Sequence, residues 1–290
     1  MTVDQLKNGK IVIFSHYATT GACEELRDWL VGLAAREVVY VAFPFGRNPD
    51  RFIRVERWRA GQRDAMRRSL VRLRLPEPLA YAKDFVYALW YAWRFGRGAD
   101  ALVAGDNLLA LAAVLARRAA GLRRVVYYMI DYTPVRYANR LLNAAYYCVD
   151  RWAACGADAV WPLTAKMIRA RFEAGRLDER RVRWYEVPYG CHVLPQAGDR
   201  SDARHVVYLG DITRSKGAEL FVPFALALRK RVPDFTLTLI GGGPDLASLR
   251  DEIERAGLRD RVITVGFIES FGEALALLAT GGVAIAPYAD

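Results

Sequence analysis

The sequence contains few cysteines and histidines, and their spacing excludes two kinds of site. It holds four cysteines and three histidines in 290 residues, with no C-x-x-C pair and no histidine at metal-ligand spacing. A zinc site and a disulfide framework are both recognised by such spacings. We therefore expect buried free thiols and no bound metal or other cofactor.

Long apolar segments are also missing. The N-terminus "MTVDQLKNGKIVIFSHY" has no apolar core with a small-residue cleavage site, and apolar runs such as "NLLALAAVLA" are too short to span a bilayer. We expect a cytoplasmic protein.

The sequence does contain a repeated alternation of short apolar runs and helical patterns. With 53% of its residues hydrophobic, the chain can bury the cores of two domains. The runs expected to be strands are residues 10–17, 37–45, 99–105, 123–131 and 157–164, followed by four more near residues 206, 235, 262 and 283. Near-continuous apolar strands separated by helices are typical of parallel sheets covered on both faces. We predict an α/β fold with an N-terminal domain over 1–195 and a C-terminal domain over 204–290, joined by a segment within 186–205.

The positive charge is confined to the first part of the chain. Residues 1–200 hold 32 Lys and Arg against 20 Asp and Glu, whereas residues 201–290 hold 10 against 12. Residues 47–74 alone contain ten arginines and three acids, with apolar residues between them. Such a segment could bind an anionic membrane or a phosphorylated partner, or it could be a solvated basic face. Nucleic acid is not the expected partner, because no nucleic-acid-binding motif accompanies the charge.

The stretch "FTLTLIGGGP" runs from an apolar strand into three glycines ahead of a helical pattern. It does not fit the dinucleotide motif G-x-G-x-x-G, because Leu246 stands at the sixth position and no acid follows at the expected distance. NAD is therefore disfavoured. Residues 241–243 still place bare backbone amides before a helix, where an anion is stabilised. A tight turn without a ligand explains the same glycines.

One strand earlier, "VVYLGDITRSKG" places Lys216 where a helix begins. The carboxyl ends of neighbouring parallel strands share one edge of a sheet, so we expect the lysine and the glycine loop to lie close together. A cation beside bare backbone would suit a diphosphate. The alternative is an ordinary solvated lysine at a helix start.

Taken together, these stretches resemble the retaining, nucleotide-sugar-dependent glycosyltransferases of family 4, which have the two-lobed GT-B architecture with two Rossmann-like lobes. The similar segments are "LGDITRSKG", "VPDFTLTLIGGGP" and "RVITVGFI", in the family's order and spacing. The first lobe agrees more loosely, through "FSHYATTGACEELRDWL" and the segment that ends at "VPYGCH".

The resemblance implies a UDP- or GDP-sugar donor and an acceptor that could be lipid-linked or phosphorylated. It assigns to the donor site the residues Gly21, Arg214, Lys216, Gly242, Gly243, Phe267 and Ile268. No metal is required for this chemistry, because cations and helix dipoles can stabilise the leaving diphosphate. Asp131 and His16 are the catalytic candidates beside the sugar. Each also has a plainer explanation, a turn acid for Asp131 and a strand-end histidine for His16.

The sequence departs from the family pattern at three places. Asp211 stands where the family has an arginine, so Arg214 would supply the second cation. Ile130 stands where a histidine is common. The carboxylate pair E-x7-E, expected shortly after "VAIAPY", is absent.

We accordingly expect a C-terminally truncated chain with an incomplete second lobe that catalyses nothing by itself. The function that the resemblance implies is sugar transfer with retention of the anomeric configuration. A peripheral location of the protein at the inner face of a membrane is compatible with this function. A nucleotide-sugar epimerase of the same architecture and an inactive fragment are the alternatives.

Overall fold

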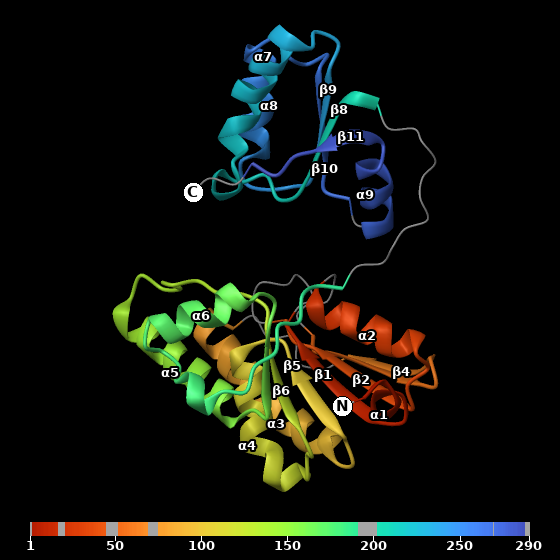
Figure 1. Cartoon of the computed structure of the whole chain (residues 1–290), viewed down its shortest axis with the longest axis vertical. Helices are drawn as coiled ribbons and strands as arrows, with labels where there is room; N and C mark the ends of the chain where they lie inside the picture. Colours follow the sequence, from red (N-terminus) through yellow and green to blue (C-terminus); the bar gives the residue numbers. More distant parts are fainter. Residues whose placement is uncertain are drawn as a thin grey trace. The chain divides into compact units, whose positions relative to one another are not determined.

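Near-continuous apolar strands form the centre of each of two compact units, Met1–Cys191 and His192–Asp290 (Figure 1). The structure, a computed structural model, describes residues 2–16, 21–44, 52–68, 75–190, 202–268 and 270–287. The predicted α/β fold with parallel sheets is confirmed in both units. Residues 191–201, most of the predicted linker, lie outside the described residues.

The first unit contains a seven-stranded sheet with the order β4-β3-β2-β1-β5-β6-β7. Its five parallel strands are β1 (Lys10–Ser15), β2 (Glu37–Ala42), β5 (Ala101–Ala104), β6 (Val125–Met129) and β7 (Ala159–Pro162). All five lie within the segments that the sequence predicts as strands. The strand order reverses between β1 and β5, and such reversals are where open α/β sheets bind ligands.

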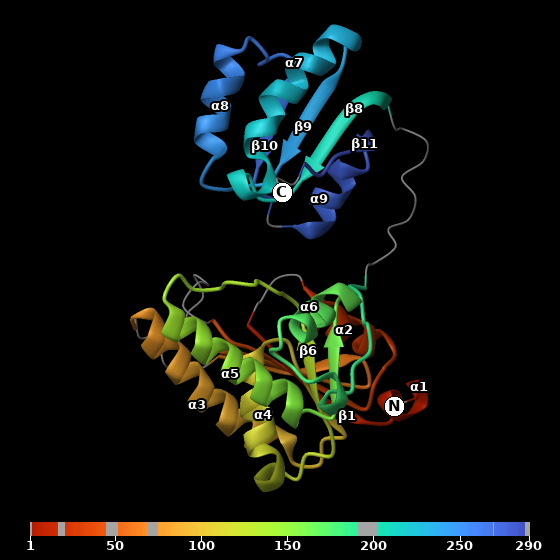
Figure 2. The ribbon, with the colours of Figure 1, turned by 60° about the vertical axis from the view of Figure 1, so that its left-hand side comes forward.

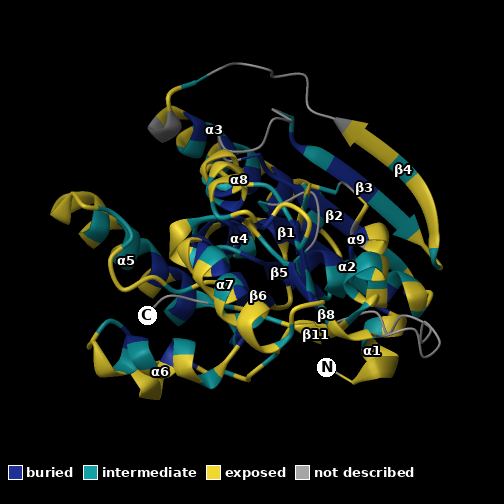
Figure 3. Cartoon of the chain, turned by 90° about the horizontal axis from the view of Figure 1, so that it is seen from above, coloured by how far each residue is buried: buried dark blue, intermediate teal, exposed yellow. Residues whose placement is uncertain are grey.

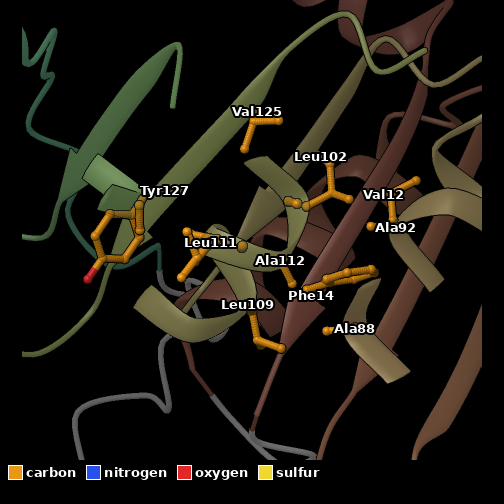
Figure 4. Close-up of a cluster of buried hydrophobic side chains, with 14 of the residues drawn as sticks. Val12, Phe14, Ala88, Ala92, Leu102, Leu109, Leu111, Ala112, Val125 and Tyr127 are labelled. Carbon is orange, nitrogen blue, oxygen red and sulfur yellow. The ribbon is translucent and has the colours of Figure 1, made fainter. Parts of the chain in front are cut away.

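Helices cover both faces of this sheet. They are α1 (Val3–Lys7), α2 (Ala22–Gly32), α3 (Glu77–Gly96), α4 (Asn107–Ala120), α5 (Arg140–Gly156) and α6 (Ala165–Glu173), followed by a short 3-10 helix, Glu179–Arg181. One core lies between the sheet and α3, α4 and α5, and the other lies under α2. Figure 4 shows the first core, where Phe14 and Leu102 of the strands meet Ala112 and Leu109 of α4.

The arginine-rich segment contributes a hairpin that the sequence pattern did not predict. Strands β3 (Arg54–Arg59) and β4 (Gln62–Arg68) extend the sheet antiparallel to β2. Ile53 and Val55 are buried in the core, which anchors the hairpin. Seen from above, the central strands are buried and β4 is mostly exposed (Figure 3). The described part of this segment is therefore the edge of a sheet.

The second unit has a four-stranded parallel sheet with the order β10-β9-β8-β11. Its strands are β8 (Asp202–Leu209), β9 (Thr236–Ile240), β10 (Val262–Gly266) and β11 (Gly281–Ala284), the four that the sequence predicts. Helices α7 (Phe221–Arg231) and α8 (Leu246–Arg255) pack on one face, and α9 (Phe271–Leu278) packs on the other (Figure 2). Two 3-10 turns, Arg214–Lys216 and Ala218–Leu220, lead from β8 into α7.

Among the described residues, no helix is long and apolar enough to cross a membrane.

Candidate functional site

A pocket of about 500 Å³ lies at the carboxyl edge of the first sheet. It is formed by the end of β1, the start of α2 and the loop after β6. Its lining residues are Ser15, His16, Gly21, Ala22, Cys23, Glu24, Ile130, Asp131, Thr133, Arg136 and Tyr189. Because β1 borders the point where the strand order reverses, the pocket occupies the usual ligand position of an open parallel sheet.

Three residues that the sequence assigns to the site line this one pocket: His16, Gly21 and Asp131. The Nδ1 atom of His16 lies 3.7 Å from an Asp106 carboxylate oxygen, so an acid and not only backbone faces the ring. Gly21 stands immediately before α2 with an extended backbone, and a Cβ there would lie 2.8 Å from a carboxylate oxygen of Glu24. Glycine at this position keeps the pocket open above Glu24.

Asp131 forms an ion pair with Arg136. The Nη1 atom of Arg136 donates to the Asp131 carboxylate at 2.7 Å, and the Asp131 side chain remains 56% exposed. Burial opposes the charge of Arg136, but the hydrogen bond and the charge of Asp131 outweigh it and raise the pKa of the guanidinium. Arg136 therefore stays charged at neutral pH, and the pair lines the pocket with a guanidinium and a carboxyl group.

Glu24 is a pocket residue that the sequence analysis did not identify. Its carboxylate is buried and accepts hydrogen bonds from Ser15 Oγ, at 2.9 Å, and from the hydroxyl of Tyr40. Burial and the adjacent Glu24 raise the pKa of Tyr40, which keeps that hydroxyl protonated as a donor. Glu24 lies in the first turn of α2, where the helix dipole stabilises a carboxylate. The sequence signal that could have identified Glu24 is an acidic residue in the first turn of the helix that follows the first strand.

Cys23 lies beside Glu24 but is a structural residue. Its side chain is buried, and burial raises the pKa of the thiol well above its ordinary value. Because the thiolate is the reactive form, this cysteine is not poised as a nucleophile.

A buried network holds the loop that carries Asp131. Arg171 of α6 and Asp150 of α5 form an ion pair at 2.9 Å, and the Tyr127 hydroxyl donates to the same carboxylate at 2.7 Å. Arg171 also donates to the backbone carbonyl of Asp131 at 3.3 Å, and its guanidinium lies 4.5 Å from the ring centre of Tyr132. Nothing in the sequence spacing pairs these residues.

In the second unit, the loops after β8 and β9 join through backbone hydrogen bonds. The amide of Gly210 donates to the carbonyl of Ile240, and that of Ile212 donates to Gly242. The Asp245 carboxylate accepts from the amide of Arg214 at 2.8 Å. The two loops that the sequence placed at one sheet edge are therefore in direct contact.

The glycines of the second loop allow this close approach. Gly241 and Gly243 have φ angles of 145° and 154°, and a Cβ on either would collide with the carbonyl of Gly210 or Ile212. The tight-turn explanation thus holds for these two. In the described part of the chain, the amides of Gly242 and Gly243 donate to no other backbone group. The loop therefore combines a turn with backbone donors for an anion.

The remaining residues of the predicted donor site lie on neighbouring loops of this unit. The Lys216 ammonium donates to Asp211 at 2.9 Å, and Arg214 is exposed two residues before it. Phe267 is 75% exposed after β10, and its Cβ would lie 3.2 Å from a Cβ placed on Gly242. Ile268 packs against the core under α9. In the described ranges, no three His, Cys, Asp or Glu side chains are grouped to hold a metal ion.

Comparison with known proteins found a family match in the second unit and relatives that align over short stretches. Residues 194–287 match the family described as Glycosyl transferases group 1. α-D-Kanosaminyltransferase of Streptomyces kanamyceticus is 38% identical over 63 residues, which cover 22% of this chain and 16% of that protein. D-Inositol 3-phosphate glycosyltransferase of Paenarthrobacter aurescens is 44% identical over 70 residues, or 22% and 17% of the two chains. The aligned part is thus less than a fifth of each relative.

Solved structures resemble the chain over nearly its whole length. Anabaena HepE, solved with UDP and glucose, is 17% identical with a TM-score of 0.62, covering 96% of this chain and 73% of that one. The catalytic domain of starch synthase IV from Arabidopsis thaliana, bound to ADP and acarbose, is 11% identical with a TM-score of 0.62, covering 97% and 78%. At these identities the likeness concerns the fold. The chain has the GT-B fold with two Rossmann-like lobes, as the sequence predicts.

Proposed function

We propose that this protein is a glycosyltransferase that moves a sugar from a nucleoside-diphosphate sugar to an acceptor with retention of the anomeric configuration. The observation that carries the proposal is the pair of joined loops in the second unit, where Lys216 and the amides of Gly242 and Gly243 follow adjacent parallel strands. The group 1 family match covers the same loops. HepE, which shares the fold, was solved with UDP and glucose.

The proposed donor site binds the diphosphate through cations and backbone amides. Transfer breaks the bond between the sugar C1 and the diphosphate oxygen, so negative charge develops on the leaving group. Lys216, Arg214 and the two glycine amides would stabilise that charge, as donors preorganised for a developing anion do. Phe267 and Ile268 would offer backbone to the base, and the assignment of Gly21 to donor binding stays a prediction.

The pocket of the first unit would take part in sugar or acceptor binding. Asp131 and His16 can accept hydrogen bonds from hydroxyl groups, and Arg136 can bind an anionic substituent. Glu24, which accepts hydrogen bonds from Tyr40 and Ser15, adds a buried carboxylate to the wall of the same pocket. These residues supply the polar groups of a site for a polyhydroxylated ligand.

The acceptor is proposed to be anionic, either lipid-linked or phosphorylated. The excess positive charge of residues 1–200 supports an anionic partner, which we propose to lie at the inner face of a membrane in the cytoplasm. The inactivity that we expect of the 290-residue chain stays a prediction. The proposed function is therefore tested first by donor binding, which requires no catalysis.

Calorimetric titration of the chain with UDP, GDP, NAD and a short oligonucleotide tests the donor site. We expect a nucleoside diphosphate to bind and Lys216→Ala to weaken it by at least about tenfold, the loss of a charge-assisted contact. Lys230→Ala, at the far end of α7, is the matched control and should change nothing. NAD or oligonucleotide binding instead of UDP or GDP would contradict the proposal.

A transfer assay tests the reaction itself. A UDP- or GDP-sugar is incubated with acceptor extracts, and the anomeric configuration of the product is read by NMR. Retention supports the proposal, inversion contradicts it, and epimerised donor without any acceptor product would favour the epimerase alternative.

A further inference from the structure

Helices α3, α4 and α5 form a layer whose outer surface is apolar and basic. They cover one face of the first sheet and pack side by side, α3 on α4 and α4 on α5 (Figure 2). Their inner faces are buried in the core, and their outer faces carry large exposed apolar side chains. We call this outer surface the α3–α5 face.

Helix α3 contributes a continuous exposed stripe. Apolar residues recur at spacings of three and four, which places them on one side of a helix. They are Leu79, Ala82, Val86, Trp90 and Trp93. Trp90 remains 48% exposed and Trp93 38%. The guanidinium of Arg97 lies 4.6 Å from the ring centre of Trp93, at the end of the stripe.

Helices α4 and α5 continue the same surface. The exposed residues of α5 follow the same spacing: Leu141, Ala145, Cys148 and Trp152. Leu115 is the exposed apolar residue of α4, between the two other helices. Each helix ends shortly before a parallel strand begins, and Trp93, Leu115 and Trp152 all lie in the last two turns. All three side chains therefore lie near the edge of the sheet where the parallel strands begin.

Among the side chains that the structure describes, the exposed charged ones on these helices are all basic. The exposed arginines are Arg94, Arg118, Arg140 and Arg151. The acids of the three helices whose side chains the structure describes, Asp84 and Asp150, are both buried. The α3–α5 face thus combines tryptophan, leucine and arginine without an exposed described acid.

We propose that the α3–α5 face binds the surface of an anionic lipid bilayer. Tryptophan and leucine insert at the boundary of headgroups and acyl chains, and arginines around them bind anionic headgroups. The absence of exposed acids among the described side chains fits this occupant, because an anionic surface repels carboxylates. Large apolar side chains exposed on three adjacent helices are a feature of interaction surfaces.

We place the membrane contact on the α3–α5 face and not on the described hairpin of residues 52–68. Within the hairpin, Arg57 pairs with Asp64 at 2.6 Å and Arg54 pairs with Glu56 at 2.9 Å. These arginines already have acidic partners, and the hairpin lacks an apolar helix face. The α3–α5 face offers both components of membrane binding.

The location also deepens the proposed function and, in this respect, rests on it. Leu141 and Leu142, at the start of α5, are exposed, and Asn143 beside them accepts from the amide of Arg136 in the pocket loop. An amphiphilic acceptor held in the bilayer would thus reach the protein next to the pocket. Vesicle binding measures no sugar transfer, so its outcome is independent of the enzymatic assay.

Co-sedimentation of the full chain with vesicles tests the proposal. Vesicles of phosphatidylcholine alone are compared with vesicles that contain about a third phosphatidylglycerol. We expect binding to the anionic vesicles, weakened by salt and accompanied by a blue shift of tryptophan fluorescence. The double variant Trp90→Ala/Trp93→Ala should lose at least about tenfold in partitioning, and each of Arg94→Gln and Arg151→Gln about fivefold.

Matched variants separate this surface from the rest of the molecule. Trp152→Ala is compared with Trp29→Ala, because Trp29 is an exposed tryptophan on α2, on the other face of the sheet. The variants Arg63→Gln and Arg67→Gln test whether the hairpin contributes to vesicle binding. Thermal melts verify that each variant is folded. Equal loss in Trp29→Ala or in the hairpin variants, or no preference for anionic vesicles, would overturn the proposal. So would a dimer in light scattering that Trp90→Ala/Trp93→Ala dissociates, because the face would then bind a second copy.

Discussion

The ammonium of Lys216 lies 2.9 Å from the carboxylate of Asp211, five residues before it in the same loop. The two residues lie where the resemblance to family 4 enzymes expects two cations, so the loop carries an ion pair instead. Both side chains are partly exposed, and such a pair is worth at most about 1 kcal/mol. A diphosphate can therefore displace Asp211 from Lys216, at the cost of repulsion from that carboxylate.

Removing that carboxylate should strengthen donor binding. We expect Asp211→Asn to lower the dissociation constant of UDP about three- to tenfold at low salt, because an uncharged amide no longer repels the diphosphate. Calorimetry measures the change. Asp234→Asn, an exposed acid at the opposite end of β9, is the control. Weaker binding by Asp211→Asn would mean that the carboxylate orients Lys216 productively.

Two neighbouring glycines of the second loop, Gly242 and Gly243, should respond differently to replacement by alanine. Gly243→Ala should destabilise the protein by about 1–3 kcal/mol or more, because φ is 154° and a Cβ would collide with the Ile212 carbonyl. Gly242→Ala should be milder, since the nearest atom lies at 3.2 Å and φ is not positive. Urea denaturation gives both values. Equal destabilisation would show that the turn is not what selects glycine.

The buried Arg171–Asp150 pair should be essential to the fold of the first unit. We expect Arg171→Met to cost about 3–5 kcal/mol in the free energy of unfolding, because Asp150 would be left as a buried, poorly compensated charge. The double variant Arg171→Met/Asp150→Leu should recover part of this loss.

A positioning role adds a second readout. Because Arg171 holds the carbonyl of Asp131, hydrogen exchange at the amides after Asp131 should accelerate in a folded Arg171→Lys variant. Unchanged exchange there would restrict Arg171 to a purely structural role.

Alkaline pH should unfold the protein through its buried tyrosines. Burial first, and then neighbouring carboxylates, raise the pKa of Tyr40 and of Tyr127 above the ordinary value of a tyrosine. Below pH 10 both states hold these protons, so stability is unaffected. Above it the unfolded chain loses protons that the native state keeps, and stability falls by about 1.4 kcal/mol per pH unit for each group.

Urea denaturation between pH 8 and 11 measures this slope. Tyr40→Phe should reduce this slope by the contribution of one titrating group. Tyr185→Phe, at an exposed residue, should leave the slope unchanged. A stability that rises with pH in this range would contradict the assignment.

The alternation of strands and helices in both units, and the residues at the strand ends, can be read from the amino-acid sequence. Each parallel strand is a short apolar run, and its end is marked by glycine, proline or a polar residue, so both can be read locally. His16, Asp131, Lys216 and the glycine loop were found in this way. Because neighbouring parallel strands end at one edge, the contact between the loop that carries Lys216 and the glycine loop followed directly.

Which polar groups meet, and which surfaces stay uncovered, depends on how the helices and strands pack. Glu24 and Tyr40 are sixteen residues apart, and Arg171 and Asp150 twenty-one, and each pair forms only after the helices dock on the sheet. The addition of β3 and β4 to the edge of β2 likewise depends on Ile53 and Val55 finding the core. The tryptophans of α3 and α5 have helical spacing whether a helix buries one face or two, so their exposure could not be read from the pattern. It depends on packing between elements distant in sequence, which local propensity does not encode.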